Sequence, residues 1–290
     1  MSFNHRNIFI ASILWAFSIG STVAQNDTLK VLSWNVFLRP RIMSDGQMAR
    51  VDSIAHYLNQ SNADVLIVQE AFHRKARKLL TYLLSDNYAF HTNAGPKSFF
   101  GVPSGVVIYS KIPFKQKESH FSYRHATGSD RMAKKGIVKI VTDFNGNEIA
   151  VIGTHLQAGR GEKRRNIRKK QVDLINSVKN TISDSTILIY AGDFNISAAS
   201  PQYDSLVKIL RAENFQPTST IKSTSNFNDH DLTSGSGKPN WIDFILLRRK
   251  KSIKFVSSRI ESPRQFSEGK FKRLSDHNSI ISTFVILEEE

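Results

Sequence analysis

Six apolar runs that each end in an acid, an amide or a histidine constrain the fold of this chain more than any other feature of its sequence. They alternate with amphipathic helical patterns, such as residues 47–59, and this alternation favours strands buried on both faces between layers of helices. A carboxylate at the end of an apolar strand needs a partner, because a buried charge is costly unless it is paired or bound to a metal. If the strand ends converge, they form one cluster of carboxylate, amide and imidazole groups. The positions are Asn35 (in VLSWNV), Gln69–Glu70 (VLIVQE), Thr154–His155 (VIGTHL), Asp193 and Asn195 (AGDFN), Asp243 (WIDFIL) and Asp276–His277 (SDHNSI).

Such a cluster would suit metal-assisted hydrolysis of a phosphodiester. The chain has no cysteine, and an oxygen-rich ligand set is typical of a hard cation such as Mg²⁺. A bound Mg²⁺ stabilises charge on a phosphoryl oxygen, and a histidine paired with an aspartate accepts a proton from water near neutral pH. For one residue alone, such as Asp193, a helix cap is the more ordinary explanation, but six strand ends together favour a site. The chain contains neither the nucleophile elbow of a serine hydrolase nor a GxxxxGK[ST] phosphate-binding loop.

The net charge of +15 and the pI near 10 indicate an anionic partner, which includes phosphodiesters, nucleic acid and anionic lipid surfaces. Basic residues gather in residues 163–170 and 248–251. Apolar residues recur at helical spacing from Ile167 to Ile182, so we expect the basic side chains of a helix over residues 162–181 to lie largely on its solvated side. The charge narrows the substrate to an anion and goes no further.

Residues 1–24 have the layout of a secretory signal peptide. His5 and Arg6 precede an apolar run, residues 8–20, that is short for a bilayer span, and small residues at 22–24 offer a cleavage site. An uncleaved membrane anchor is the alternative. Residues 25–290 contain neither a repeat nor a long linker, so we expect one secreted or periplasmic catalytic domain that folds without disulfides.

The ordered motifs SWNV, VQEAF, GTHLQ, GDFN, WIDFIL and SDH are similar to those of the endonuclease/exonuclease/phosphatase superfamily, to which deoxyribonuclease I belongs. The resemblance runs from about Lys30 to Leu287. It implies a four-layered α/β sandwich, in which two mainly antiparallel sheets pack face to face and helices flank them. It also implies a dependence on Mg²⁺, with Mn²⁺ or Co²⁺ as substitutes.

The resemblance also implies a role for each polar strand end. It makes Glu70 the principal Mg²⁺ ligand, with Asn35 beside it and Asp276 completing the metal side of the site. It makes His277 the base that activates water, oriented by Asp243.

On the substrate side, the resemblance implies that Asp193 and Asn195 position the nucleophile and the scissile phosphate. His155 would stabilise the phosphate oxygens or assist the leaving group.

Three details resemble the bacterial sphingomyelinase C branch of the superfamily. Phe37 stands where the DNA-repair endonucleases carry a second acid, and GTHLQA at residues 153–158 has the form typical of this branch. The segment DRMAKKG, residues 130–136, resembles the short Lys-Gly segment of these enzymes and makes Lys135 a candidate contact for the substrate phosphate. A solvated lysine in a turn is the alternative reading of Lys135.

Membrane contact is the point at which the chain departs from that branch. Its members carry an aromatic-tipped hairpin before SDH, and residues 261–274 offer only Phe266 and Phe271 among several charges. Phe99 and Phe100 could contact lipid, although adjacent aromatic residues more often pack in a core.

From these patterns we expect a monomer, without a protein partner, that hydrolyses sphingomyelin or a related phospholipid at a membrane surface. The products would be ceramide, or diglyceride, and phosphocholine. A secreted nuclease of the same superfamily, which the charge of +15 would suit, is one alternative. A phosphatase acting on a soluble or inositol-based ester is another.

Overall fold

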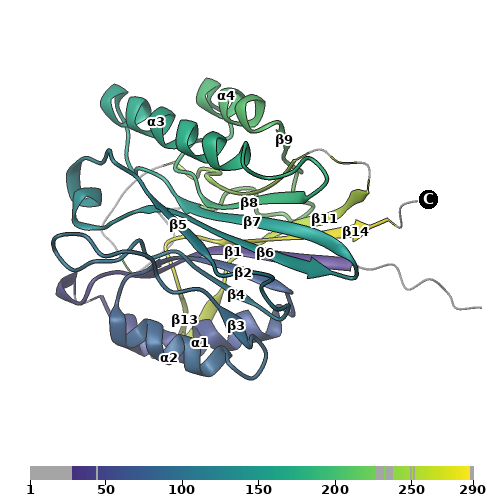
Figure 1. Cartoon of the computed structure of the whole chain (residues 1–290). Helices are drawn as coiled ribbons and strands as arrows, with labels where there is room; N and C mark the ends of the chain where they lie inside the picture. The colour runs from purple at the N-terminus through teal and green to yellow at the C-terminus, as the bar shows by residue number, and fades with distance from the viewer. Residues whose placement is uncertain are drawn as a thin grey trace, which may run out of the picture.

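The computed structural model describes residues 28–43, 45–225, 232, 238–248, 250 and 252–287. Two six-stranded sheets pack face to face, and a pair of helices covers the outer face of each (Figure 1). This four-layered arrangement confirms the predicted fold class. The helices are α1 (Gln47–Gln60) and α2 (Arg74–Leu84) on the first sheet, and α3 (Glu162–Lys179) and α4 (Pro201–Leu210) on the second.

Each sheet is built around one parallel pair of strands joined through a helix. In the first sheet, with order β11-β14-β1-β2-β4-β3, the parallel pair is β1 and β2, and α1 connects them. In the second, with order β5-β6-β7-β8-β10-β9, it is β7 and β8, connected by α3. The other pairings are antiparallel. The bounds are β1 Thr28–Leu38, β2 Val65–Ala71, β3 Phe90–His91, β4 Val107–Ser110, β5 Ser119–Ser122, β6 Gly136–Phe144, β7 Asn147–His155, β8 Ile187–Asp193, β9 Ala212–Glu213, β10 Asp243–Arg248, β11 Ile253–Glu261 and β14 Ser279–Ile286.

This topology brings the polar strand ends to one edge. Parallel neighbours end at the same edge of a sheet, and an antiparallel neighbour begins where they end. The register pairs His155 with Asp193 across β7 and β8, and Asp193 with Asp243 across β8 and β10. In the first sheet Asn35 pairs with Gln69, and His277 immediately precedes β14, the antiparallel neighbour of β1.

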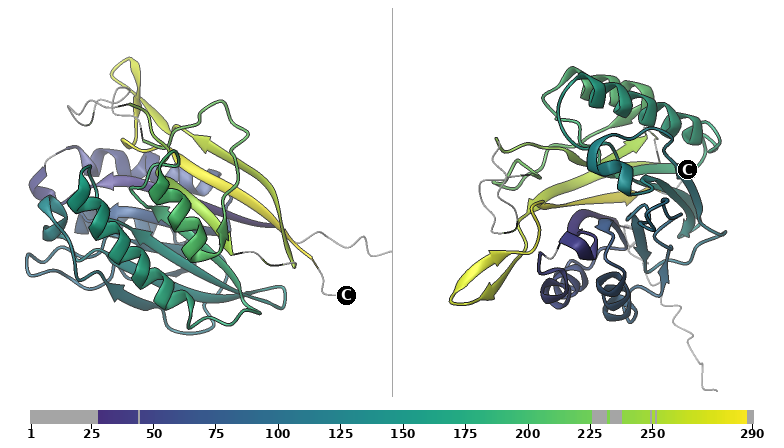
Figure 2. Two further views of the ribbon diagram at one scale, coloured as in Figure 1. Left: turned by 90° about the horizontal axis from the view of Figure 1, so that it is seen from above. Right: turned by 90° about the vertical axis from the view of Figure 1, so that its left-hand side faces the viewer.

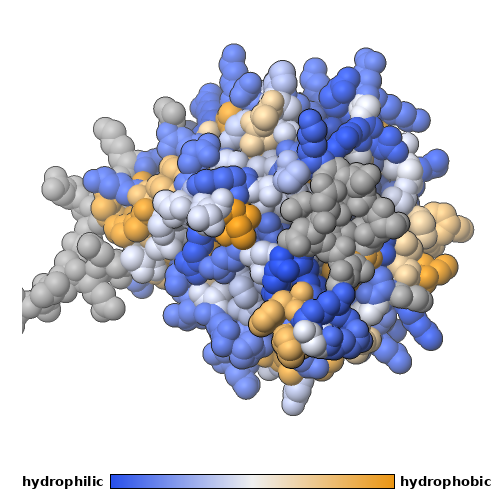
Figure 3. All heavy atoms as spheres, turned by 180° about the vertical axis from the view of Figure 1, so that it is seen from behind, coloured by the Kyte–Doolittle hydropathy of each residue, from blue (hydrophilic) through white to orange (hydrophobic). Residues whose placement is uncertain are grey.

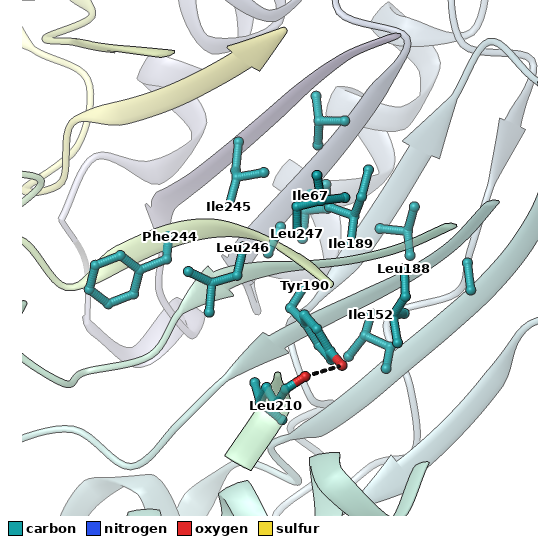
Figure 4. Packing of buried hydrophobic residues seen from close by; sticks show 14 of the residues in the cluster. Ile67, Ile152, Leu188, Ile189, Tyr190, Leu210, Phe244, Ile245, Leu246 and Leu247 are labelled. Carbon is teal, nitrogen blue, oxygen red and sulfur yellow. Dashed lines mark hydrogen bonds between the residues drawn. The ribbon is translucent and has the colours of Figure 1, made fainter. Parts of the chain in front are cut away.

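Two apolar clusters hold the layers together. The larger fills the space between the sheets and beneath α3 and α4, and Figure 4 shows part of it, with Tyr190 donating from its hydroxyl to the Leu210 carbonyl at 3.3 Å. The smaller lies between the first sheet and the helices α1 and α2. In α2 the buried positions Ala76, Leu80 and Leu84 recur every four residues, which places one stripe of the helix against the sheet.

Several features differ from the expectations. Most basic side chains of α3 are exposed, as expected for Lys163, Arg165, Lys169 and Lys170, but Arg168 and Lys179 are buried. Arg168 donates to the carbonyls of Gln157 and Gly159 at 3.0 and 2.9 Å, so its charge ties down the loop that follows β7. The helix α4 was not predicted, although Pro201 at its start is a favourable first helical residue.

The hairpin of β12 (Arg264–Ser267) and β13 (Lys270–Arg273) projects from the body of the molecule, as the right-hand view of Figure 2 shows in yellow. The predicted signal peptide, residues 1–24, lies outside the described residues. Within the described part of the chain, no helix is both long enough and apolar enough to cross a bilayer.

Candidate active site

A histidine–aspartate pair lies at the centre of the strand-end cluster. His277 Nδ1 donates to Asp243 Oδ2 at 2.8 Å, and both side chains are buried. Backbone contacts also hold His277, because its carbonyl accepts from Trp34 Nε1 at 3.0 Å and its amide donates to Ser275 Oγ at 3.1 Å. The imidazole therefore has a fixed orientation, with Nε2 on the side of Asp193.

The charge state of His277 follows from its neighbours. Burial would lower its pKa, but the carboxylates of Asp243 and Asp193 outweigh burial and raise the pKa of His277 well above its ordinary value. Asp193 Oδ2 lies 3.8 Å from His277 Nε2. Burial and then Asp243 raise the pKa of Asp193 to about 7.

Asp193 links the two sides of the cluster. Its Oδ1 accepts from the amide of Asn195 at 2.9 Å, so part of this carboxylate does cap the turn that follows it. Its Oδ2 accepts from Asn35 Nδ2 at 3.2 Å and lies 3.4 Å from His155 Nε2. Asn195 in turn donates from Nδ2 to the Leu156 carbonyl at 3.2 Å, which fixes the amide next to the loop after β7.

Lys135 lies inside the site, which excludes the reading of this residue as a solvated turn lysine. Its Nζ contacts His155 Nε2 at 2.9 Å and pairs with Asp130 Oδ1 at 3.0 Å. Burial, and then the charges of Lys135 and His277, lower the pKa of His155 well below its ordinary value, so His155 is neutral. Its Nδ1 is buried without a hydrogen-bond partner in the described part of the chain.

Glu70 lies beside Asn35 at an irregularity of the first sheet. The pairing of β1 with β2 shifts register after Asn35, and both Phe37 (φ 51°) and Glu70 (φ 56°) adopt the left-handed conformation there. Such conformations disfavour non-glycine residues by roughly 1–3 kcal/mol each and concentrate at functional sites. Asn195 (φ 52°) shares this feature on the second sheet. The bulge turns the Glu70 carboxylate to the edge where the other polar groups meet.

Close packing of β7 against β8 explains the glycine of the GDFN motif. Gly192 has φ 147°, and a Cβ at this position would lie 2.0 Å from the Thr154 carbonyl oxygen. A side chain at residue 192 would therefore separate β7 from β8 just before His155 and Asp193, which are register partners.

The carboxylates gathered here fit a divalent cation. Burial and then the nearby carboxylate of Asp276 raise the pKa of Glu70, as expected where two acids lie close together. Asp193, Asp243 and His277 each offer a ligand atom within 4.8 Å of the others. Asp243 Oδ1 is buried without a hydrogen-bond partner among the described residues. An oxygen-rich set with one imidazole and no thiolate suits a hard metal ion.

Asn35 connects the two groups of possible ligands. Its Nδ2 donates to Glu70 Oε1 and to Asp193 Oδ2, both at 3.2 Å, while its Oδ1 accepts from the amide of Phe37 at 3.1 Å. In this orientation the amide nitrogen faces the carboxylates, so Asn35 would need a rotated amide to offer oxygen to a metal. The ligand set of Glu70, Asn35 and Asp276 stays a prediction.

Arg50 of α1 is a site residue that the sequence pattern did not indicate. This buried guanidinium donates to the carbonyls of Val36 and Phe37, at 3.1 and 2.6 Å, and to that of Leu274 at 2.5 Å. It thus joins the end of β1 to the segment that carries Asp276. Asp130 was likewise missed as a site residue, although it opens the DRMAKKG segment.

Two pairs of exposed aromatic residues lie outside the catalytic cluster. Phe266 and Phe271 face each other across the β12–β13 hairpin, with ring centroids 5.2 Å apart, and each is 66% exposed. Phe99 is 99% exposed and Phe100 63%, so the expectation that adjacent aromatic residues pack in a core is wrong for this pair. Residues 98–101 form a turn that directs both rings outward.

Comparisons with known proteins identify the family of the chain. The model of the endonuclease/exonuclease/phosphatase family matches residues 32–277. Sphingomyelinase C of Leptospira interrogans is 28% identical over 218 residues, which cover 68% of this chain but only 39% of that protein. Phospholipase C of Staphylococcus aureus is 27% identical over 271 residues, or 82% of this chain and 79% of that protein.

Solved structures have the same fold as this chain. Beta toxin of S. aureus superposes with a TM-score of 0.77 at 25% identity, covering 88% of this chain and 99% of the toxin. A mutant of that toxin, solved with bound magnesium ions, superposes with a TM-score of 0.72 at 24% identity.

Proposed function

Since this chain belongs to the endonuclease/exonuclease/phosphatase family and is a phosphodiester hydrolase, we propose that it cleaves sphingomyelin or a related phospholipid into ceramide, or diglyceride, and phosphocholine. The observation that carries the proposal is the His277–Asp243 pair at 2.8 Å, buried among carboxylates at the edge where both sheets end. The choice of lipid follows the names of the relatives, Sphingomyelinase C and Phospholipase C.

His277 is the proposed general base. Asp243 holds the proton on Nδ1, which leaves Nε2 to accept a proton from the attacking water. The site's carboxylates favour the imidazolium, so the base needs an opposing positive charge nearby to be neutral.

Magnesium is the proposed cofactor, held by Glu70 and Asp276, with Asn35 beside them. When bound, it supplies positive charge to the phosphoryl oxygens of the transition state. On the opposite side of the cluster, Lys135 offers a second positive charge to the phosphate, and Asp130 fixes its ammonium. Asp193 and Asn195 orient the water and the phosphate, and neutral His155 lies beside the leaving group.

A lipid surface is the proposed location of the substrate. The exposed Phe266–Phe271 pair on a projecting hairpin supports contact with a bilayer, because exposed aromatic residues are stable at membrane interfaces. We further propose that residues 1–24 are a signal peptide removed on export and that residues 25–290 form the catalytic domain. Exported protein should then begin near residue 25 on N-terminal sequencing, and retention of residues 1–24 in a membrane fraction would contradict this.

The decisive experiment gives the purified protein, with Mg²⁺, sphingomyelin vesicles, plasmid DNA and a soluble phosphate monoester in parallel. Release of phosphocholine with intact DNA supports the proposal. Nicked DNA with untouched lipid would keep the catalytic residues but assign the enzyme to nucleic acid, an alternative that the net charge of +15 favours. Cleavage of the monoester alone would identify a phosphatase.

A further inference from the structure

A strongly basic cavity lies beside the catalytic cluster and plays no part in the proposed chemistry. Its volume is about 870 Å³. Six lysine and arginine residues line it, but only one carboxylate does, that of Glu162. None of the six has a carboxylate of a described residue within 4.0 Å. The six are Lys97, Arg124, Arg131, Lys134, Lys163 and Lys170, and all are exposed.

The segment that runs from η2 (Gly128–Met132) to the start of β6 forms a wall that the cavity shares with the active site. Asp130 and Lys135 turn inward, where they pair with each other, whereas Arg131 and Lys134 line the cavity. Tyr123 also lines the cavity, and its hydroxyl lies 2.6 Å from Thr154 Oγ1, next to His155 in the chain. The cavity is therefore adjacent to the catalytic cluster.

A well-anchored aromatic turn lies at the edge of this cavity. The turn is closed by the amide of Ser98 donating to the Val102 carbonyl at 2.8 Å and by that of Gly101 donating to Ser98 at 2.9 Å. Ser98 Oγ also donates to the Met132 carbonyl, at 2.5 Å, which joins the turn to η2. Phe99 lines the cavity, and its ring packs edge-on against Phe100 at 5.5 Å.

The combination of exposed aromatic rings with cations behind them is typical of an interfacial membrane site. Apolar rings enter the boundary between headgroups and acyl chains, and lysine or arginine residues attract anionic lipids. The back face of the protein carries mostly hydrophilic side chains, with apolar ones in small separate groups (Figure 3). An anchored turn that exposes two phenylalanines therefore indicates a surface for a partner.

We propose that this cavity binds the headgroup of an anionic phospholipid while Phe99 and Phe100 enter the bilayer. Phosphocholine lipids carry no net charge, so the proposed substrate does not explain six unpaired cations in one cavity. The inference rests on the proposed function only in placing the protein at a lipid surface. The anionic lipid would act as an anchor that holds the enzyme on the membrane beside its substrate.

The test is co-sedimentation of the full chain with vesicles of phosphatidylcholine alone or with one fifth phosphatidylglycerol, without sphingomyelin. The cavity variant is Lys97→Gln, Arg131→Gln, Lys170→Gln. Each lysine or arginine near an anionic surface contributes about fivefold to binding, so the three together should weaken binding to anionic vesicles about a hundredfold. Neutral vesicles should bind both proteins equally, and added salt should abolish the difference.

A control variant removes the same charge elsewhere, through Lys75→Gln, Lys78→Gln and Lys254→Gln, which are exposed positions outside the cavity. Its binding to anionic vesicles should stay near that of the unmodified protein, and an equal loss in both variants would overturn the proposal in favour of diffuse attraction.

A second variant, Phe99→Ser with Phe100→Ser, should also bind anionic vesicles more weakly. If the cavity variant loses affinity for a single-stranded oligonucleotide but keeps it for vesicles, the cavity is a nucleic-acid site and the lipid proposal is wrong. Because these outcomes are read from binding alone and every variant keeps the proposed catalytic residues, they do not depend on which phospholipid the chain hydrolyses.

Discussion

Replacing Arg50 with methionine should slow turnover far more than its effect on stability would explain. The guanidinium donates to the carbonyls of Val36 and Phe37, near the end of strand β1, and to that of Leu274, two residues before Asp276. Arg50 thus fixes the distance between the end of β1, which carries Asn35, and the segment that carries Asp276 and His277. Methionine fills a similar volume but donates no hydrogen bond.

The structure allows an estimate of both effects. Three hydrogen bonds are lost, and at about 1 kcal/mol each the free energy of unfolding should fall by about 3 kcal/mol. For a chain of this size that corresponds to a fall in Tm of about 6–12 °C. Activity should fall further, because a misplacement of about 1 Å in a catalytic group can reduce the rate about a hundredfold.

Arg248 provides a matched control at the opposite end of the second sheet. It is also buried and donates three hydrogen bonds, to the carbonyls of Thr186 and Ser183 and to Asp184, but it ends β10 whereas Asp243 begins it. Arg248→Met should lower the Tm by a similar amount and leave kcat near that of the parent. Steady-state kinetics and thermal unfolding of both variants decide the matter, and equal kcat values for the two would refute the positioning role of Arg50.

Three further predictions concern the catalytic groups themselves. His277→Ala should reduce kcat at least a thousandfold with an unchanged circular dichroism spectrum. The control His56→Ala, at an exposed position of α1, should leave kcat unchanged. Near-normal turnover of His277→Ala would remove His277 from the mechanism. A chelator should abolish hydrolysis and lower the Tm, and Mg²⁺ should restore both, so full activity in the chelator would exclude the metal. In the chelator, the free energy of unfolding should fall between pH 7 and pH 9. The pKa of His277 is raised in the folded state, so as the pH rises the unfolded chain loses the His277 proton at a lower pH than the folded chain does. A Tm that rises over this range would contradict the assignment.

The strand ends could be predicted from the sequence because the relevant signal is local. A polar residue that follows an apolar run marks the end of a strand, and the order of the runs then matched a known fold. The site also depends on the order of strands across each sheet, which local patterns do not contain, so the prediction that the strand ends converge rested on the family resemblance. The topology explains why the ends of β1, β2, β7 and β8 and the starts of β10 and β14 share one edge.

Residues whose roles depend on distant partners could not be predicted. Arg50 reads as one polar position in a helical pattern, and its contact with Leu274 spans 224 residues of sequence. Lys135 was ambiguous for the same reason, since its burial depends on Asp130 and His155 meeting around it. The outward direction of Phe99 and Phe100 depends on a turn anchored to Met132, which no pattern near residue 99 indicates.

The first sheet pairs strands from the two ends of the sequence, and this pairing determines when activity can appear. β14 pairs with β1 at residues 28–33 and lies between β1 and β11, so the last strand of the chain completes the sheet that the first strand begins. A chain that ends before residue 275 lacks both His277 and β14, which is one of the two strands that pair with β1, so one edge of β1 stays unpaired. Until β14 has paired with β1, the chain lacks His277 at the edge where the other polar groups meet, so we expect catalytic activity only after this last pairing has formed.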